Sequence, residues 1–187
     1  MLLKNPAGEL PRVNKSAYIS EYAVIIGNVE IGENVIIAPN ATIRADEPGS
    51  RIIIGSGCNI QDNVVIHALQ GSTVLVGNKT SLSHGCIVHG PCTIGNNCFI
   101  GFGSVVFNCV VGNGCVVQHM ALLKDVTIPD RKTVNDGMVV NEQDTADKLD
   151  KVTKDLTDFA TRVVSVNLML SESYPKITHK LIKNTAK

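Results

Sequence analysis

Three histidines lie close together in the middle of the chain, and histidine side chains are common ligands of metal ions. His67, His84 and His89 all fall within Asn59–Pro91, and the other two histidines lie nearer the C-terminus. Zinc held by three neutral imidazoles keeps a fourth position open for water, which becomes a nucleophile near neutral pH. A histidine can also act alone as a general base. The elements that position the three residues decide between these chemistries.

A six-residue repeat sets the positions of the histidines. From Ala23 the sequence divides into hexads such as AVIIGN, VEIGEN and VIIAPN, with breaks at Glu47–Arg51 and Gln70–Thr73. The third position of each hexad is aliphatic, the first is mostly small, and Gly and Asn recur at regular positions. This pattern predicts short strands joined by turns in a mainly β solenoid. Three hexads per coil would make a triangular prism with parallel sheets on its sides, over roughly Tyr22–Pro129.

The repeat stacks two of the histidines in one column. A residue three hexads further along the chain lies one coil higher, about 4.8 Å away. Hexad positions one and three point into the prism, so position four points outward. His67 and His89 both occupy position four, with Arg44 one coil below and Phe107 one coil above. Two stacked imidazoles can share one metal ion.

His84 belongs to a second column on a different side of the prism. It lies above Asp62, which has Gln61 beside it, and below Phe102, and His119 follows two coils above His84. A side of the prism is roughly 15–20 Å across, so His84 is expected to lie too far from the first column of its own chain. A neighbouring chain can supply it, and a threefold ring of chains closes without unused columns. The sequence therefore predicts a homotrimer with three metal sites, each shared by two chains.

The alternative for an outward histidine is an ordinary solvated side chain. We expect this for His119 and for His179, which lies near the polar C-terminal tail. For His67 and His89 it would require two imidazoles to be stacked by coincidence, with Arg44 completing their column. Metal binding is therefore favoured for this pair.

All six cysteines occupy the first, inward position of a hexad. They are Cys58, Cys86, Cys92, Cys98, Cys109 and Cys115. We expect small, buried, reduced residues rather than zinc ligands, because ligands would have to leave the core and converge outside it. The N-terminal segment has no apolar region typical of a secretory signal, which favours a cytoplasmic location and free thiols.

The composition argues against two classes of partner. Among 187 residues, 17 Lys and Arg balance 17 Asp and Glu, there is no Trp, and only 4% of residues are aromatic. Nucleic acid or an anionic membrane would call for a basic stripe, and single-stranded nucleic acid for stacking aromatics. No apolar run is long enough to span a bilayer. We therefore expect neither a nucleic-acid nor a membrane partner.

A different pattern follows the repeat, which is expected to stop after Pro129. Over Asn141–Ser173, apolar residues recur at spacings of three and four. They are Leu149, Val152, Leu156, Phe159, Val163, Val166 and Leu170. The spacing predicts an amphipathic helix, or a broken pair of helices, that ends at Tyr174-Pro175. It is expected to pack on an outer face of the prism, and a coiled coil is the alternative. Residues 1–140 would form the β-helix, and residues 141–187 a helical segment and tail in the same domain.

Several stretches of the sequence resemble the γ-class carbonic anhydrases, which are left-handed β-helices of hexapeptide repeats. The matching stretches are IRADE (Ile43–Glu47), NIQDNVVIHAL (Asn59–Leu69), SLSHGCIVHGP (Ser81–Pro91), VTIPD (Val126–Asp130) and SVNLMLSESY near the end of the expected helix. The resemblance covers nearly the whole chain. It implies that His67 and His89 of one subunit and His84 of the next hold the metal. The family metal is zinc, with iron or cobalt also functional.

The resemblance also implies roles for residues around the metal. It implies subunit contacts for Arg44, Asp46 and Asp62. It places Glu47 and Gln61 near the metal-bound water, and Asn167 close to the bound substrate. The stacking rule adds Phe102 and Phe107 above the histidines, where they can shelter an apolar gas or pack between subunits.

The chain departs from the family pattern at two places. The family archetype has a longer acidic loop after the first histidine, with a glutamate that passes protons to solvent. Here that loop is the short Gln70–Thr73, and Ser165 stands where the archetype has a tyrosine. The chain thus resembles a subgroup without the acidic proton-shuttle loop. Glu47 is the carboxylate expected to relay the proton instead.

The expected activity is that of a carbonate dehydratase, a zinc- or iron-dependent lyase. Metal-bound hydroxide would convert CO2 reversibly to bicarbonate, with Gln61 orienting the hydroxide or the product. Two alternatives stay open. One is an acyltransferase of the same hexapeptide-repeat fold that uses a histidine as general base without a metal. The other is a non-catalytic trimeric scaffold or assembly protein.

Overall fold

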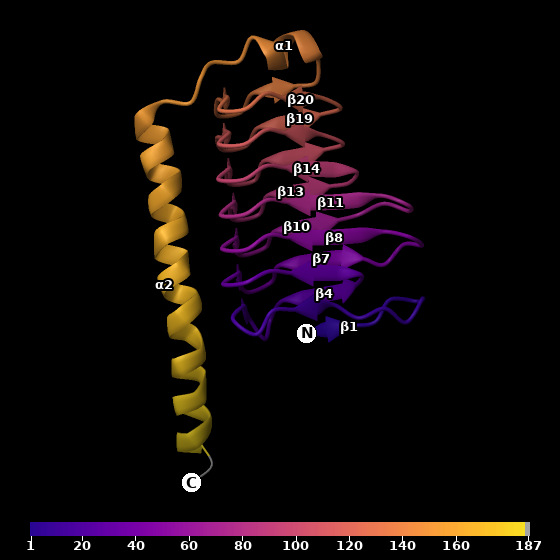
Figure 1. Ribbon diagram of the computed structural model, residues 1–187, viewed down its shortest axis with the longest axis vertical. Coiled ribbons are helices and arrows are strands. Elements are labelled where there is room, and N and C mark those ends of the chain that lie inside the picture. Colours follow the sequence, from indigo (N-terminus) through magenta and orange to yellow (C-terminus); the bar gives the residue numbers. More distant parts are fainter. Residues whose placement is uncertain (186–187) are drawn as a thin grey trace.

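The computed structural model is a left-handed parallel β-helix with a long helix along one side (Figure 1). It describes the backbone of residues 1–185 and the side chains of residues 1–174. Within these residues the strands form three sheets, and strands that follow one another along the chain belong to different sheets. Each strand pairs in parallel with the strand three elements later, so the chain rises one coil at a time. The predicted prism of parallel sheets is confirmed.

The three sheets are named A, B and C below. Sheet A contains β1 (Leu2–Leu3), β4 (Val24–Gly27), β7 (Thr42–Ala45), β10 (Val65–His67), β13 (Ile87–His89), β16 (Val105–Phe107), β19 (Leu122–Lys124) and β22 (Val139–Val140). Sheet B contains β2 (Arg12–Val13), β5 (Val29–Ile31), β8 (Arg51–Ile54), β11 (Thr73–Val76), β14 (Cys92–Ile94), β17 (Val110–Val111) and β20 (Thr127–Ile128). Sheet C contains β3 (Tyr18–Ile19), β6 (Ile36–Ile37), β9 (Asn59–Ile60), β12 (Ser81–Leu82), β15 (Phe99–Ile100), β18 (Val116–Val117) and β21 (Thr133–Val134).

The first and third hexad positions fill the interior, as the sequence predicts. Ile43, Ile66, Val88 and Val106 stack in one such column and are completely buried. All six cysteines are buried free thiols. Each coil therefore adds one more layer to a continuous core, and the outward positions remain available for function.

The corners of the prism keep the coils in register. Adjacent coils come close together where the strands of sheet B end. A Cβ added to Gly77 would lie only 2.6 Å from the carbonyl carbon of Gly95 in the next coil, so only glycine fits there. Other corners use residues with a left-handed backbone, such as Asn63 with φ of 60°, a conformation that asparagine tolerates well. These turns fix the hexad length and hence which residue lies above which.

The β-helix is longer than the hexads indicate. Strands β1, β2 and β3 precede Tyr22, and β21 and β22 follow Pro129, so the strands extend beyond the hexad pattern at both ends and lie within the segment 1–140 assigned to the β-helix. The outer strands pair through backbone hydrogen bonds, which do not require a particular side chain. The ladder of backbone hydrogen bonds therefore continues beyond the residues that follow the hexad pattern.

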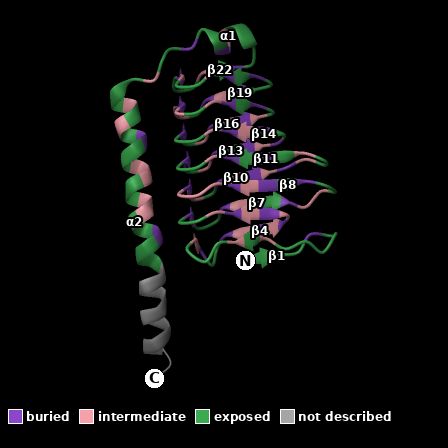
Figure 2. Cartoon of the chain, in the orientation of Figure 1, coloured by how far each residue is buried: buried purple, intermediate pink, exposed green. Residues whose placement is uncertain are grey.

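Two helices follow the last strand, so the broken pair is the alternative that the structure adopts. α1 (Gln143–Asp147) contacts β20 and β22 at one end of the prism, and α2 (Lys154–Thr185) runs back along sheet C (Figure 1). Phe99 and Val116 of sheet C and Ala160 of α2 form a small buried cluster between them. Figure 2 shows that α2 alternates exposed residues with partly or fully buried ones along its described length. The predicted packing on an outer face is confirmed.

The prediction that the helix ends at Tyr174-Pro175 is wrong. The backbone of α2 continues through Pro175 to Thr185. Proline has a φ near that of a helix and lacks only its own N–H, so a helix can pass through one proline at a cost. Before this point Tyr174 stacks on Tyr18 of sheet C, with ring centroids 4.8 Å apart, and this contact holds the helix to the sheet. No helix in the described residues combines the length and the apolar composition needed to cross a membrane.

Candidate metal centre

The first predicted column is confirmed by the strand register. Arg44, His67, His89 and Phe107 are the last or next-to-last residues of β7, β10, β13 and β16 and lie directly above one another. Their side chains point outward because the preceding residue of each strand fills the core. The ring of His89 stacks on Phe107 at a centroid distance of 5.2 Å. The column lies at the corner where sheet A leads to sheet B.

The two imidazoles of this column face each other. Nδ1 of His67 lies 3.1 Å from Nε2 of His89. The other nitrogen of His67, Nε2, points to two carboxylates, with Asp46 Oδ1 at 3.5 Å and Glu47 Oε1 at 3.4 Å. The His67 side chain is only 15% exposed, and its Nε2 is buried without a hydrogen-bond partner among the described residues. Both carboxylates directly follow β7: Asp46 ends a hexad, and Glu47 begins the break after it.

Neighbouring side chains hold these carboxylates in place. Arg44 donates from Nε to Asp46 Oδ2 at 3.1 Å. The backbone N–H of Gln70 donates to Glu47 Oε2 at 2.6 Å, so the short loop after His67 binds the carboxylate directly. Arg44 therefore acts on the histidine pair through Asp46, and Glu47 bridges that pair and the Gln70 loop.

The second predicted column is also confirmed. Nδ1 of His84 lies 2.8 Å from Asp62 Oδ2, and the backbone N–H of His84 donates to Gln61 Oε1 at 3.3 Å. The Phe102 ring lies 5.3 Å from His84 and stacks on His119 at 4.2 Å. This column lies in the turns between sheet C and sheet A, on the opposite side of sheet A from His67.

The two remaining histidines are His119 and His179. His119 was expected to be solvated, but it is partly buried, and its Nδ1 accepts a hydrogen bond of 3.0 Å from the backbone N–H of Phe102. The side chain of His179 lies outside the described residues. In the described part of the chain, no group of three or more His, Cys, Asp or Glu side chains could hold a metal ion. One chain therefore does not bring the two columns together.

Between the two columns, sheet A presents an outward row of mainly aliphatic side chains, which we call the aliphatic column. It consists of Val24, Thr42, Val65, Ile87, Val105, Leu122 and Val139. Six of these seven residues are Val, Ile or Leu, although they point away from the core. Ile87 is 37% exposed and Val139 is 54% exposed. Sheet A thus carries both histidine columns on the edges of an apolar face.

Asn167 lies apart from the first column in the single chain. It is on α2, and its Nδ2 donates to the Val163 carbonyl at 2.8 Å. No hydrogen bond in the described part of the chain links it to any of the three histidines. Sheet C, which α2 covers, contains three buried polar groups without a described partner: Asn59 Nδ2, Ser81 Oγ and Ser83 Oγ. Sequence reasoning did not single out these three residues, because only the placement of the chain around them buries their outward positions.

The donor set fits a metal ion in its chemistry and spacing. Two nitrogens bound to one tetrahedral ion at about 2.0–2.1 Å lie roughly 3.3 Å apart, close to the 3.1 Å between His67 and His89. Metal-binding histidines usually give their second nitrogen to a carboxylate or a carbonyl. His67 faces Asp46 and Glu47, His84 faces Asp62, and Nδ1 of His89 lies 3.4 Å from the Gly90 carbonyl. Each imidazole thus has one nitrogen near an oxygen and the other available.

Comparisons with known proteins give consistent similarities. The family described as bacterial transferase hexapeptide (six repeats) matches residues 11–45 and 73–108. A carboxysome assembly protein CcmM from Nostoc is 44% identical over 173 residues, which are 87% of this chain and 31% of that protein. The chain therefore spans about a third of that relative's length. A carbonic anhydrase from Methanosarcina thermophila is 40% identical over 191 residues, 91% of this chain and 77% of that protein. A solved hexapeptide transferase family protein from Anaplasma phagocytophilum superimposes with a TM-score of 0.80 at 29% identity and covers 93% of this chain and 98% of its own.

Proposed function

Because the chain belongs to the hexapeptide-repeat family that includes the carbonic anhydrase of Methanosarcina thermophila, we propose that it is a γ-class carbonic anhydrase. In this proposal it is a metal-dependent lyase that converts CO2 reversibly to bicarbonate. The observation that carries the proposal is the orientation of His67, His84 and His89. Each has one nitrogen near a carboxylate or carbonyl oxygen and the other available for a metal.

The proposed centre is shared between two chains of a homotrimer. His67 and His89 of one chain would hold the metal together with His84 of the next, because the two columns lie on opposite edges of sheet A. The aliphatic column between them supports this arrangement, since six aliphatic residues on an outer face, of which Ile87 and Val139 are exposed and the others partly buried, are unfavourable in water. Zinc is the metal we propose, with iron or cobalt as substitutes. When bound, such an ion supplies hydroxide near neutral pH by lowering the pKa of water.

The surrounding residues would orient substrate and move the proton. Asp62 fixes the ring of His84 through the 2.8 Å contact, and Arg44 fixes Asp46 beside His67. The amides of Gln61 and Asn167 can donate hydrogen bonds to bicarbonate oxygens. Glu47 has one oxygen near His67 and is 36% exposed, so we propose it as the group that passes the proton to solvent.

The apolar side of the centre is formed by two phenylalanines. Phe107 stacks on His89 and Phe102 lies against His84, so these two histidines each have a phenyl ring one coil above them. In the assembled trimer these rings would exclude water from the place where CO2, an apolar gas, approaches. The polar residues Asp62, Gln61 and Arg44 lie on the other side of the histidines, where the charged product would be hydrogen-bonded.

A second candidate function is that of an assembly module. The relative from Nostoc is named a carboxysome assembly protein, and it shares 44% identity with this chain. An assembly module would use the same trimer without turning over CO2. An acyltransferase is favoured less, because three histidines with oriented second nitrogens exceed what a single general base requires.

Metal analysis and subunit mixing test the proposed centre. Light scattering should give three chains per particle and elemental analysis about one metal ion per chain. His84→Ala and His67→Ala proteins should each be inactive in stopped-flow CO2 hydration and should recover part of the activity when refolded together, because some interfaces then combine intact partners. The matched control mixes His67→Ala with His89→Ala, which damage the same half-site and should not complement.

The outcomes separate the candidates. A monomer that binds a full equivalent of metal would overturn the shared centre. A trimer with metal but no activity, whether loaded with zinc or iron, would overturn the enzyme and favour the assembly module. A trimer that binds no metal ion would favour the acyltransferase class, which uses a histidine as general base without a metal.

A further inference from the structure

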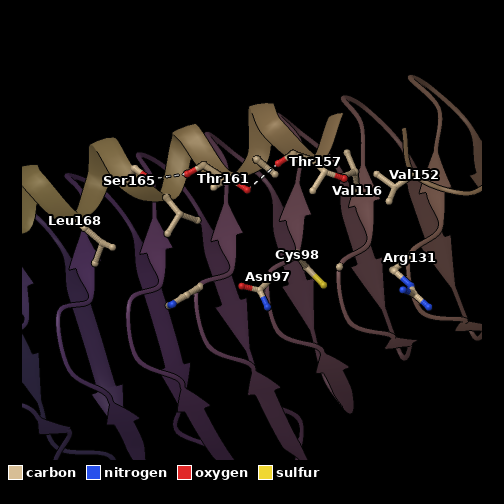
Figure 3. A pocket seen from close by; sticks show the side chains of 13 residues that line it. Asn97, Cys98, Val116, Arg131, Val152, Thr157, Thr161, Ser165 and Leu168 are labelled. Carbon is tan, nitrogen blue, oxygen red and sulfur yellow. Dashed lines mark hydrogen bonds between the residues drawn. The ribbon is translucent and has the colours of Figure 1, made fainter. Parts of the chain in front are cut away.

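A hollow of about 420 Å³ lies between α2 and the turns that connect sheet B to sheet C. Figure 3 shows its lining, with Asn97 and Arg131 on the turn side and Thr157, Thr161 and Ser165 on the helix. This corner of the prism is separate from sheet A, which carries the histidine columns. The hollow is within the size range of small-molecule pockets in proteins. We call it the α2 hollow.

The turn side of the α2 hollow carries positive charge at both ends. Lys79, Asn97, Gly114 and Arg131 occupy the same position in four successive coils, as the backbone hydrogen bonds between these coils show. Lys79 and Arg131 are therefore three coils, or roughly 14 Å, apart. In the described part of the chain, neither cation makes an ion pair or a side-chain hydrogen bond. None of the thirteen residues that line the hollow is acidic.

The opposite side of the hollow is effectively apolar. The hydroxyls of Thr157, Thr161 and Ser165 donate to backbone carbonyl oxygens four residues earlier, at 2.9–3.0 Å, so these protons are not available to a ligand. Val164 and Leu168 complete this side. Between the two sides, Val116 of sheet C and Ala160 of α2 line the hollow. A ligand would thus meet hydrocarbon in the middle and a cation at each end.

We propose that the α2 hollow binds a slender dianion, such as a linear dicarboxylate, with its aliphatic middle along α2 and its two acidic groups at Lys79 and Arg131. The guanidinium of Arg131 suits a carboxylate because it can donate two parallel hydrogen bonds. The ammonium of Lys79 attracts the other end as a point charge. The side-chain amide of Asn97, which has no hydrogen-bond partner among the described residues, lies one coil from it. Apolar contact in the middle favours an aliphatic chain over a compact dianion. The inference does not depend on the metal centre.

Calorimetric titration of the full chain with decanedioate tests the proposal. We expect saturable binding that weakens as salt is raised, since the cations are exposed. Decanoate, which has one carboxylate, and butanedioate, which is too short to reach both cations, should bind about tenfold more weakly or not at all. Lys79→Gln and Arg131→Gln should each weaken decanedioate binding about fivefold to tenfold. Ser165→Phe should block the hollow and abolish binding.

The matched control is Arg162→Gln, which removes an exposed cation of α2 that does not line the hollow, and it should leave binding unchanged. Three results would each overturn the proposal. They are no binding of decanedioate to the unaltered chain, equal binding of decanoate, and unchanged binding after Arg131→Gln and Lys79→Gln. Circular dichroism checks that the variants fold. If Ser165→Phe does not fold, the two glutamine variants still decide, because Lys79 and Arg131 are exposed and outside the core.

Discussion

At the scale of single residues, Glu47 lies between the proposed centre and solvent. One carboxylate oxygen is 3.4 Å from His67, and the other is held by the Gln70 amide. Glu47→Gln keeps the size of the side chain and removes the group that can carry a proton. We predict that it lowers kcat at least about tenfold and changes kcat/KM little, because proton transfer follows the CO2 step. Stopped-flow CO2 hydration in weakly buffered solution measures both constants.

Two controls make this prediction specific. Added imidazole should restore part of the activity of Glu47→Gln, since a small buffer can carry the proton instead. His119→Ala should have no such effect, because Phe102 lies between His119 and His84. A slow His119→Ala enzyme beside a normal Glu47→Gln enzyme would show that the proton leaves along the second column.

The six cysteines are predicted to be unreactive in the native protein. All are buried, and they are stacked: Cys92 lies below Cys109, and Cys98 below Cys115, in the core. A hydrogen bond between the thiols of this last pair raises the pKa of Cys98. Thiol titration should give close to zero groups in the native protein and six after denaturation. Rapid native labelling of several thiols would contradict the inward assignment of the first hexad position.

Burial of the thiols also makes stability depend on pH. Burial raises the pKa of Cys58 to about 11 and the pKa values of Cys86 and Cys92 to about 12. Unfolded thiols ionise near pH 8.5. The folded state therefore keeps protons that the unfolded chain loses, so the stabilisation is complete below about pH 8.5 and is lost as the pH rises towards 11–12. By pH 10 each of these thiols should lower the free energy of unfolding by about 2 kcal/mol.

Urea unfolding at pH 7, 8.5 and 10 measures this loss. A Cys86→Ala variant starts from a lower stability, because it removes a buried sulfur, but it should lose less stability between pH 8.5 and 10 than the unaltered chain. Equal losses in the two proteins would show that another group causes the pH dependence.

The hexad period predicted the columns of residues but not the carboxylates beside His67, and Glu47 was expected near the metal only from the family resemblance. A fixed period determines which residues lie above one another, so the stacks of His67 on Arg44 and of Phe102 on His84 follow from counting. Asp46 is the last residue of its hexad and Glu47 begins the break after it, and no period describes the path of the chain through that break. Their place beside His67 depends on the Arg44 contact and on the Gln70 amide, which only the folded chain brings together.

At the scale of elements, the packing of α2 on sheet C depends on a few large side chains. Phe99 is 2% exposed and meets Phe159 of α2 edge to face, with centroids 5.1 Å apart. We predict that Phe99→Ala lowers the free energy of unfolding by about 3–5 kcal/mol, through lost burial and the cavity left behind. Phe159→Ala should cost clearly less, because Phe159 is already 36% exposed. Urea unfolding followed by circular dichroism measures both.

The control for this prediction is Arg162→Ala, an exposed position of α2 that should change stability by less than about 0.5 kcal/mol. If α2 contributed little to stability, Phe99→Ala and Arg162→Ala would have similar effects. That result would mean that sheet C is stable without its helix.

Sequence patterns predicted the elements better in the middle of the chain than at its ends. The seven strands of sheet C and the eight of sheet A all pair in parallel with the strands of the adjacent coils. The side-chain pattern that predicts this pairing is regular only between Tyr22 and Pro129. The outer strands are held by the ladder next to them, which local sequence does not reveal. The same holds for α2, which passes Pro175 although a proline usually marks an end.

At the scale of the whole molecule, the three faces of the prism have different surroundings. Sheet C is covered by α2. Sheet B carries charged pairs on its outer face, including Arg51 with Glu30 at 2.8 Å. Sheet A presents the aliphatic column between the two histidine columns. Among the described residues, sheet A is therefore the face where we place the proposed subunit interface, which would complete the proposed metal site.

Ile87 lies near the centre of this face, in the same strand as His89. We predict that Ile87→Asp converts the trimer to monomers and abolishes metal binding, because a buried unpaired carboxylate at the interface is costly. Leu75→Asp is the matched control. Leu75 is also 37% exposed and points outward from a central strand, but it belongs to sheet B. Both substitutions place the same charge on a strand, so their intrinsic effect on the β-helix should be similar.

Analytical ultracentrifugation and metal analysis of the two variants then separate assembly from folding. The expected result is a folded, metal-free monomer for Ile87→Asp and a metal-bound trimer for Leu75→Asp. If both variants remain trimers with metal, sheet A is not the interface, and His84 must reach the other histidines in another way. If Leu75→Asp alone dissociates, sheet B forms the contact between chains. Suppose that Ile87→Asp loses both the trimer and the metal but keeps its native circular dichroism. That chain would retain its fold and its own three histidines and yet hold no ion, so the result would show that metal binding requires the interface.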